Sequence, residues 1–101
     1  MRCDVVIADE AKAQIQSISD WWADNRPGGA TVFLHELNKT IELLGHVPRI
    51  GPRFRRARRP GLRRVLLRRS QHFVYYLLDE RRSVVYVLAV WSTARGSDPL
   101  L

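Results

Sequence analysis

One stretch of the sequence, from Leu62 to Trp91, constrains the fold most strongly. It contains three apolar runs rich in β-branched and aromatic residues, separated by the short polar segments 69–71 and 79–82. Segments this short allow neighbouring strands to return only as antiparallel hairpins. The stretch therefore predicts a three-stranded antiparallel meander.

The second and third of these runs are apolar on both faces. Residues 73–78 and 84–91 place apolar side chains at odd and even positions alike, whereas a strand with one face in water alternates apolar and polar residues. This sheet therefore requires cover on both sides.

The part of the chain before the meander predicts a strand and two helices. The strand covers residues 2–8, the first helix follows an N-cap at Asp9 and runs to Asn25, and the second ends at Gly45. Apolar residues recur at helical spacing: Ala11, Ile15, Ile18 and Trp22 in the first helix, and Phe33, Leu37, Ile41 and Leu44 in the second. Because Pro-Gly-Gly at 27–29 separates them, the helices form an antiparallel hairpin.

The order β-α-α-β-β-β predicts an α+β fold, with the helical hairpin packed on an antiparallel sheet and the N-terminal strand at or near its edge. We expect residues 1–101 to form a single domain. One helical hairpin covers one face only. The second face is either an exposed apolar patch that binds a partner, or it is covered by the long connection 45–61 as the sheet twists.

Positive charge is concentrated in one segment, which we call the arginine band. The chain has a net charge of +7, and ten arginines without any acid lie between residues 49 and 69, which leaves the remainder at −3. These are Arg49, Arg53, Arg55, Arg56, Arg58, Arg59, Arg63, Arg64, Arg68 and Arg69. Arginine favours planar bidentate contacts with phosphate or carboxylate.

Several classes of protein are disfavoured. We expect neither a signal peptide nor a membrane span, and the single cysteine, Cys3, cannot form an internal disulfide, so a cytoplasmic protein without a membrane partner is predicted. His35, His46 and His72 show no metal-ligand spacing, and no phosphate-binding glycine loop is present. We therefore expect no metal and no cofactor.

A site that cleaves RNA remains open. Arg63, Arg68 or Arg69 would hold the phosphate, and His72 or a tyrosine would carry the proton. The tyrosines lie inside apolar strands, however, which is more typical of core residues.

The order of elements and four motifs resemble the RelE/ParE superfamily of toxins from bacterial type II toxin-antitoxin modules. The motifs are Ile-Glu-Leu-Leu-Gly-His-Val-Pro at 41–48, Gly-Pro-Arg-Phe-Arg-Arg at 51–56, Pro-Gly-Leu-Arg-Arg at 60–64 and Val-Leu-Ala-Val-Trp-Ser-Thr-Ala-Arg at 87–95. The resemblance implies a toxin that a cognate antitoxin neutralises in a hetero-oligomer.

The resemblance leaves three activities open. ParE-like members inhibit DNA gyrase by binding it, RelE-like members cut messenger RNA on the ribosome, and an inactive relic would act only as a regulatory partner of its antitoxin. Many members carry Val-Leu-His-Gly-Ala-Arg where this chain has Val90 to Arg95, so Ser92 takes the place of the histidine. Because a hydroxyl of very high pKa is a poor proton carrier near neutral pH, a non-enzymatic gyrase inhibitor is favoured over an endoribonuclease.

The resemblance also implies site residues. For antitoxin binding these are Trp21, Trp22, Phe33, Leu37, Arg53, Arg55, Arg56, Arg58 and Arg59. Trp22 continues the apolar stripe of its helix and Trp21 is offset from it. Trp91 and Arg95 are expected to bind the target. The alternative for Arg95 is a surface salt bridge with Asp98. No catalytic residue is assigned unless the chain is a nuclease, in which case the set is Arg63, Arg68, Arg69, His72 and Arg95.

Overall fold

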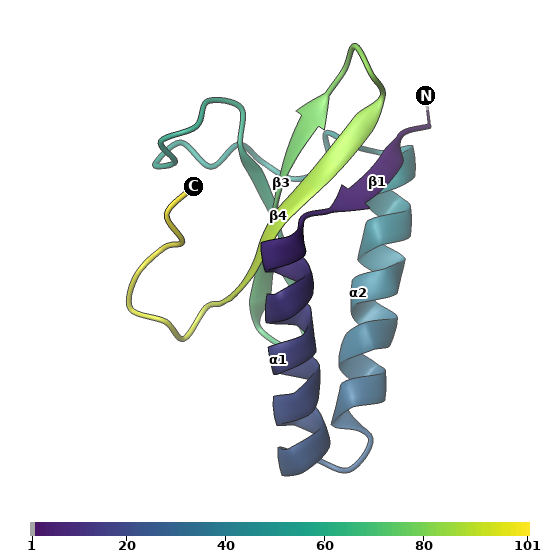
Figure 1. Ribbon diagram of the computed structural model, residues 1–101, viewed down its shortest axis with the longest axis vertical. Coiled ribbons are helices and arrows are strands. Elements are labelled where there is room, and N and C mark those ends of the chain that lie inside the picture. The colour runs from purple at the N-terminus through teal and green to yellow at the C-terminus, as the bar shows by residue number, and fades with distance from the viewer. Residues whose placement is uncertain (1) are drawn as a thin grey trace.

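The computed structural model describes residues 2–101, which form a helical hairpin packed on a four-stranded sheet (Figure 1). In chain order the elements are β1 (Asp4–Ile7), α1 (Asp9–Asn25), α2 (Gly29–His46), β2 (Arg63–Leu67), β3 (His72–Asp79) and β4 (Val84–Ser92). This is the predicted order, so the α+β fold class is confirmed. Neither helix within residues 2–101 is long and apolar enough to cross a membrane.

The strands lie in the order β1-β4-β3-β2. β2, β3 and β4 are antiparallel neighbours, which confirms the meander, and β1 lies at the edge as expected. β1 runs parallel to β4, with Asp4 opposite Val84 and Ile7 opposite Val87, so the sheet is mixed and not wholly antiparallel. A parallel pair needs a long connection, and the helices between β1 and the meander are part of one.

The helix boundaries differ from the prediction by a few residues. α1 begins at Asp9 itself, and no side chain caps it, so Asp9 belongs to the first turn, where its charge suits the helix dipole. α2 runs through Gly45 to His46. At Gly45 the N-terminal segment approaches closely: the Cys3 N–H donates to the Gly45 carbonyl oxygen (2.7 Å), and a Cβ on Gly45 would lie 3.1 Å from the Cys3 carbonyl oxygen.

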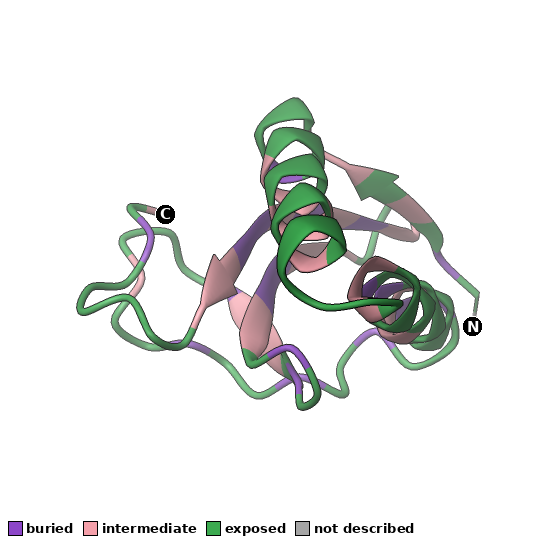
Figure 2. Cartoon of the chain, turned by 90° about the horizontal axis from the view of Figure 1, so that it is seen from below, coloured by how far each residue is buried: buried purple, intermediate pink, exposed green. Residues whose placement is uncertain are grey.

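The hairpin covers one face of the sheet and encloses the larger core. Its buried members are Cys3, Ala11, Phe33, Leu37, Leu44, Leu67, Val74, Tyr76, Val85, Val87 and Val90. In Figure 2 the strands beside the helices are mainly buried or half-buried, whereas the outer sides of both helices are exposed. The helical periodicity in the sequence therefore marks the surface that faces the sheet.

The second face of the sheet has cover of its own, so the exposed patch that the sequence left open is not present there. Phe54, Leu62, Tyr75 and Ala89 form a second buried cluster, and Leu101 packs against it. Residues 51–61, which we call the arginine loop, and the C-terminal segment 93–101 supply this cover, at the left of Figure 1. The Arg58 N–H donates to the Leu101 carbonyl oxygen (2.8 Å) and joins the two segments.

The arginine loop leaves the sheet through a tight contact at Gly51. The Gly51 N–H donates to the Tyr76 hydroxyl oxygen (2.9 Å), and burial raises the pKa of that phenol, so it stays protonated. A Cβ on Gly51 would lie 2.7 Å from the same oxygen and 2.8 Å from the Arg64 carbonyl oxygen. No larger residue fits unless the loop or β3 moves.

We therefore expect Gly51→Ala to lower the free energy of unfolding by about 1–3 kcal/mol, the usual cost of overpacking. Urea denaturation of the variant and the parent protein measures the difference. Gly96→Ala is the matched control, because a Cβ there meets nothing within 4 Å. Equal stability of the two variants would show that the loop relaxes freely around Gly51.

Candidate functional site

The arginine loop is fixed to the sheet by its backbone. The Phe54 N–H donates to the Leu62 carbonyl oxygen (2.7 Å), and the Arg64 N–H donates to the Pro52 carbonyl oxygen (3.2 Å). An isolated bridge pairs Arg53 with Arg63. The loop therefore extends the edge of the sheet beyond β2, as the sequence allowed for an irregular connection.

The Arg64 side chain connects the arginine loop to β3. Its guanidinium carbon lies 3.8 Å from the centroid of the Phe73 ring and 4.5 Å from that of the Phe54 ring, and its Nη1 donates to the Tyr75 hydroxyl oxygen (3.1 Å). Cation–π contacts and a hydrogen bond thus join loop to strand. Sequence reasoning missed this role, although a signal existed: Arg64 and Tyr75 are paired residues of the β2–β3 hairpin.

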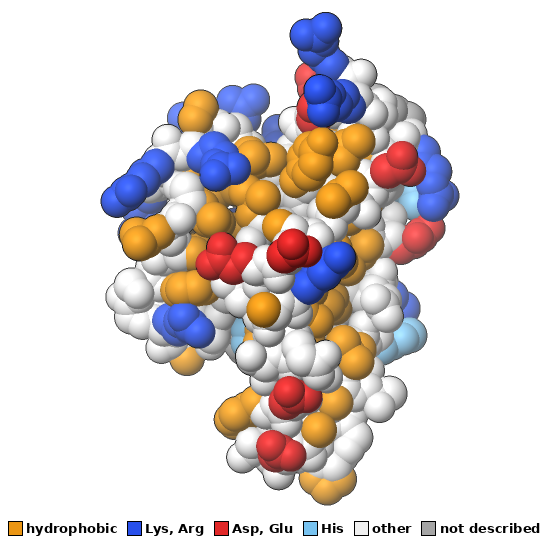
Figure 3. Space-filling model, in the orientation of Figure 1, with side chains coloured by type: hydrophobic (Ala, Val, Ile, Leu, Met, Phe, Trp, Pro, Cys, Tyr) orange, Lys and Arg blue, Asp and Glu red, His pale blue; other side chains and the backbone are white. Residues whose placement is uncertain are grey.

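The arginines of the band divide into two groups. Four have partners: Arg49 pairs with Glu80, Arg56 with Asp98 (3.6 Å), Arg63 donates to the Gly51 carbonyl oxygen (2.7 Å), and Arg64 lies among aromatic rings. Within residues 2–101 no carboxylate forms an ion pair with the other six side chains, those of Arg53, Arg55, Arg58, Arg59, Arg68 and Arg69. All six are exposed. Basic side chains gather on the outer side of the loop at the upper left of Figure 3.

The residues of the nuclease hypothesis do not meet in one cleft. His72 and Arg95 line a cleft of about 290 Å³ between the start of β3, the end of β4 and α1. Arg63 lines a different cavity on the other side of the sheet, and Arg69 lies at the tip of the helical hairpin beside Trp22 and Phe33. Arg68 is exposed on the turn between β2 and β3.

His72 is held in one tautomer. Its Nδ1 lies 2.8 Å from the Ser70 carbonyl oxygen, which can only accept a hydrogen bond, so Nδ1 carries the proton and Nε2 is left as an acceptor. Burial lowers the pKa of His72 below the ordinary 6.5, the Ser70 hydrogen bond opposes this, and the charge of Arg95 lowers it further. His72 is therefore neutral near pH 7.

The end of β4 holds the residues expected to bind a target. The guanidinium carbon of Arg95 lies 4.0 Å from the Trp91 ring centroid, and the Trp91 Nε1–H donates to the Ser97 carbonyl oxygen (2.8 Å). The alternative pairing of Arg95 with Asp98 is wrong, because Asp98 pairs with Arg56 instead. Arg95 and Trp91 are therefore brought together, with Arg95 exposed.

The four residues expected on the hairpin for antitoxin binding are not equivalent. Trp21 is 54% exposed, whereas Trp22 packs against the larger core, its ring 5.0 Å from that of Trp21. Phe33 and Leu37 are 1% and 2% exposed, so their assignment to a docking surface is wrong for this conformation. Both lie on the helical stripe that faces the sheet.

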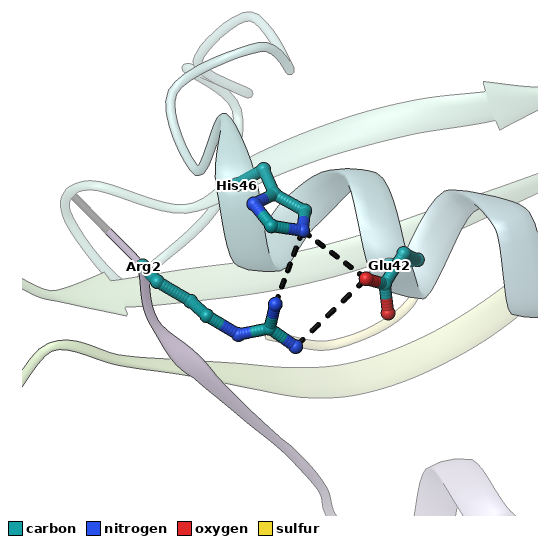
Figure 4. Close-up of polar contacts among 3 residues, drawn as sticks. All are labelled: Arg2, Glu42 and His46. Carbon is teal, nitrogen blue, oxygen red and sulfur yellow. Dashed lines mark hydrogen bonds and ion pairs between the residues drawn. The ribbon is translucent and has the colours of Figure 1, made fainter.

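A polar cluster fixes the N-terminal segment to the end of α2. Glu42, His46 and Arg2 lie together on the surface (Figure 4): the His46 Nε2 is 3.1 Å from a Glu42 carboxylate oxygen and 3.2 Å from an Arg2 guanidinium nitrogen. No group of three or more metal-ligating side chains occurs among the residues that the structure describes. The cluster joins the N-terminal segment to α2 through exposed polar contacts at the edge beside β1.

Comparison with known proteins connects this fold to toxins. The family model described as the ParE toxin of the type II toxin-antitoxin system, parDE, matches residues 5–96. A chain of the chromosomal ParDE system from P. aeruginosa is 16% identical, with a TM-score of 0.73 over 90% of this chain and 96% of that one. The E. coli RelBE complex contains a chain that is 18% identical, with a TM-score of 0.67 over 92% of this chain and 99% of that one. The M. tuberculosis RelBE2 complex contains a chain that is also 18% identical, with a TM-score of 0.63 over 91% of this chain and 99% of that one.

These likenesses concern the fold, because all three identities are low. No curated protein sequence matches the chain.

The lowered pKa of His72 gives a prediction about stability and pH. Below pH 6.5 the unfolded chain binds a proton at this residue more readily than the folded chain does, so the stability that neutral His72 supplies is lost as the pH falls from about 6.5 through the lower folded pKa. His72→Asn keeps a donor for the Ser70 carbonyl but does not titrate. We expect urea denaturation to show a smaller loss of stability between about pH 7.5 and pH 5 in this variant. Identical losses of stability in the two proteins would show that the protonation of His72 does not contribute to the pH dependence.

Proposed function

The chain belongs to the ParE toxin family of type II toxin-antitoxin systems, and from this premise we propose that it inhibits growth by binding DNA gyrase and that a cognate antitoxin neutralises it. The match to the ParE family model over residues 5–96 is the observation that carries the proposal. Gyrase is a protein target, so the proposal requires a binding surface and no catalytic group.

The end of β4 supports binding over catalysis. The Ser92 hydroxyl oxygen accepts a hydrogen bond from the Ala94 N–H (3.1 Å), so it stabilises the local turn. His72 lies opposite Ser92 in the β3–β4 pair, but within residues 2–101 no hydrogen bond joins the two side chains, because the His72 Nδ1 bonds the Ser70 carbonyl oxygen and the Ser92 hydroxyl oxygen bonds the Ala94 N–H. Beside this turn the exposed Arg95 lies over the half-buried Trp91 ring, and we assign both residues to the target.

Ribosome-dependent RNA cleavage is the second candidate, favoured by a single observation. His72 has a free Nε2, and Arg95 lines the same cleft, which would place a proton acceptor near a phosphate-binding cation. The separation of Arg63, Arg68 and Arg69 from this cleft weighs against it. A relic that only regulates remains the third candidate.

The antitoxin surface is proposed on the outer side of the hairpin. Trp21, Val32, Leu34 and Leu43 are exposed large apolar residues of α1 and α2, of the kind that a partner covers. The structures matched above include complexes of toxins with antitoxins. Arg53, Arg55, Arg56, Arg58 and Arg59 would attract an acidic antitoxin segment from the opposite side of the sheet.

The purified chain should inhibit supercoiling by gyrase. Primer extension on messenger RNA from cells that express the chain without antitoxin tests the second candidate, and unimpaired growth of those cells indicates the third.

Arg95→Ala should raise the concentration for half-inhibition of gyrase about tenfold or more, since a bond to a charged group contributes about 1.5–3 kcal/mol. Arg26→Ala, which removes an exposed arginine at the hairpin tip, is the control. Full supercoiling activity at saturating toxin would refute the gyrase proposal.

Trp21→Ala should weaken antitoxin binding by about 2 kcal/mol, which is roughly thirtyfold in Kd, because a large aromatic side chain at an interface is a common hot spot. Titration calorimetry with the antitoxin measures the change. Leu100→Ala is the control, because it removes an exposed apolar side chain from the C-terminal segment. An unchanged Kd in a folded Trp21→Ala variant would remove this residue from the interface.

A further inference from the structure

The arginine loop presents charge in an ordered way. Phe54 is buried and Ala57 is half-buried, both against the sheet, while Arg53, Arg55, Arg58 and Arg59 are exposed between and beside them. Apolar residues thus anchor the loop at two points, and guanidinium groups stand on its outer side. An arginine-rich segment kept only for solubility needs no such anchoring.

This order matters for binding. Association costs conformational entropy for every segment that it immobilises, and the loop is already held by Arg64, by the Phe54 and Arg64 backbone bonds and by Leu101. The guanidinium groups extend from a backbone that is hydrogen-bonded to residues 62–64 and to the C-terminal segment. A repeating anion can therefore be bound by several guanidinium groups at the same time.

Few carboxylates of the chain neutralise the arginines of the band. Asp98 pairs with Arg56 and Glu80 pairs with Arg49, and the six remaining side chains of the band find no carboxylate within residues 2–101. Arg53 and Arg69 line pockets that have no residue in common, so a small molecule bound in one of these pockets does not contact both arginines. Their ligand is therefore an extended polyanion and not a small molecule.

The aromatic residues decide between kinds of polyanion. Proteins that bind single-stranded nucleic acid stack bases on exposed aromatic rings beside the basic groups. Here Phe54 and Tyr75 are buried, Phe73 is half-buried beneath the Arg64 guanidinium, and Arg95 covers Trp91. The loop therefore offers charge without a stacking platform, which fits the phosphates of a duplex, where the bases are already paired.

We infer that the arginine loop binds the phosphate backbone of double-stranded DNA without reading its sequence. Arg55, Arg58 and Arg59, which are exposed on the loop, hold phosphate oxygens. The inference goes beyond the proposed gyrase inhibition and does not depend on it, because the loop contacts DNA whether or not the enzyme is present. An acidic antitoxin segment would compete for the same guanidinium groups.

The test measures anisotropy of a labelled DNA duplex of about 20 base pairs with the full chain, without gyrase or antitoxin, between about 50 and 200 mM salt. The triple variant Arg55→Gln, Arg58→Gln, Arg59→Gln should lower the magnitude of the slope of log K against log salt by about 2.7, or about 0.9 for each lost phosphate contact. The affinity at about 0.1 M salt should fall more than tenfold. All three side chains are exposed, and circular dichroism checks that the variant is folded.

The matched control, Lys12→Gln, Arg26→Gln, Lys39→Gln, removes the same charge from exposed positions on the helices. It should keep the slope of the parent chain. An equal fall in both triples would mean that net charge alone attracts DNA and would overturn the inference. So would absence of DNA binding at the lowest salt, tighter binding of an RNA duplex, or binding only to a labelled glutamate-rich peptide.

Discussion

The meander is apolar on both faces, and each face leaves water only when another part of the chain covers it. The helical hairpin covers one face with the larger core. No helix of residues 2–101 packs on the other face, which is covered by an irregular loop and the C-terminal segment through Phe54, Leu62 and Leu101. The need to bury Tyr75 and Ala89 thus positions the arginine loop, and the loop positions the charge of the protein.

Arg64 links the burial of the second face of the sheet to the position of the arginine loop. An arginine in the middle of a sheet edge would normally extend into solvent, but here it lies between the Phe54 and Phe73 rings and bonds the Tyr75 hydroxyl. Arginine suits this place because its planar guanidinium stacks on aromatic faces while its N–H groups still donate. One cation of the band therefore serves packing, which leaves the outer cations at fixed backbone positions.

Much of the fold was predictable because periodicity reports directly on which side of an element is buried. The strands of the meander and both helices follow from it, as do the partial burial of Trp22 and the exposure of Trp21. Phe33 and Leu37 fail as docking residues for the same reason, since the stripe that identifies the helix is the stripe that packs on the sheet. A docking site on the helices must therefore consist of residues outside this apolar stripe.

The cover of the second face was not predictable from pattern. Phe54 and Ala57 are single apolar residues in a polar loop without any period, and their burial depends on the β2–β3 register and on a segment some forty residues later in the sequence. The site at the end of β4 was partly predictable: Trp91 and Arg95 do lie together. The direction of the His72 ring depends on a single backbone carbonyl, that of Ser70, which no pattern reveals.

The hydrogen bond from the Arg58 N–H to the Leu101 carbonyl oxygen joins two segments that have no regular secondary structure. Because Phe54, Leu62 and Leu101 share one small cluster, each segment loses apolar contacts if the other leaves. The two should therefore open and close as one cooperative unit, while the core between the helices and the sheet stays intact. The protein is in this sense two layers of different local stability, with the less stable layer carrying most of the charge.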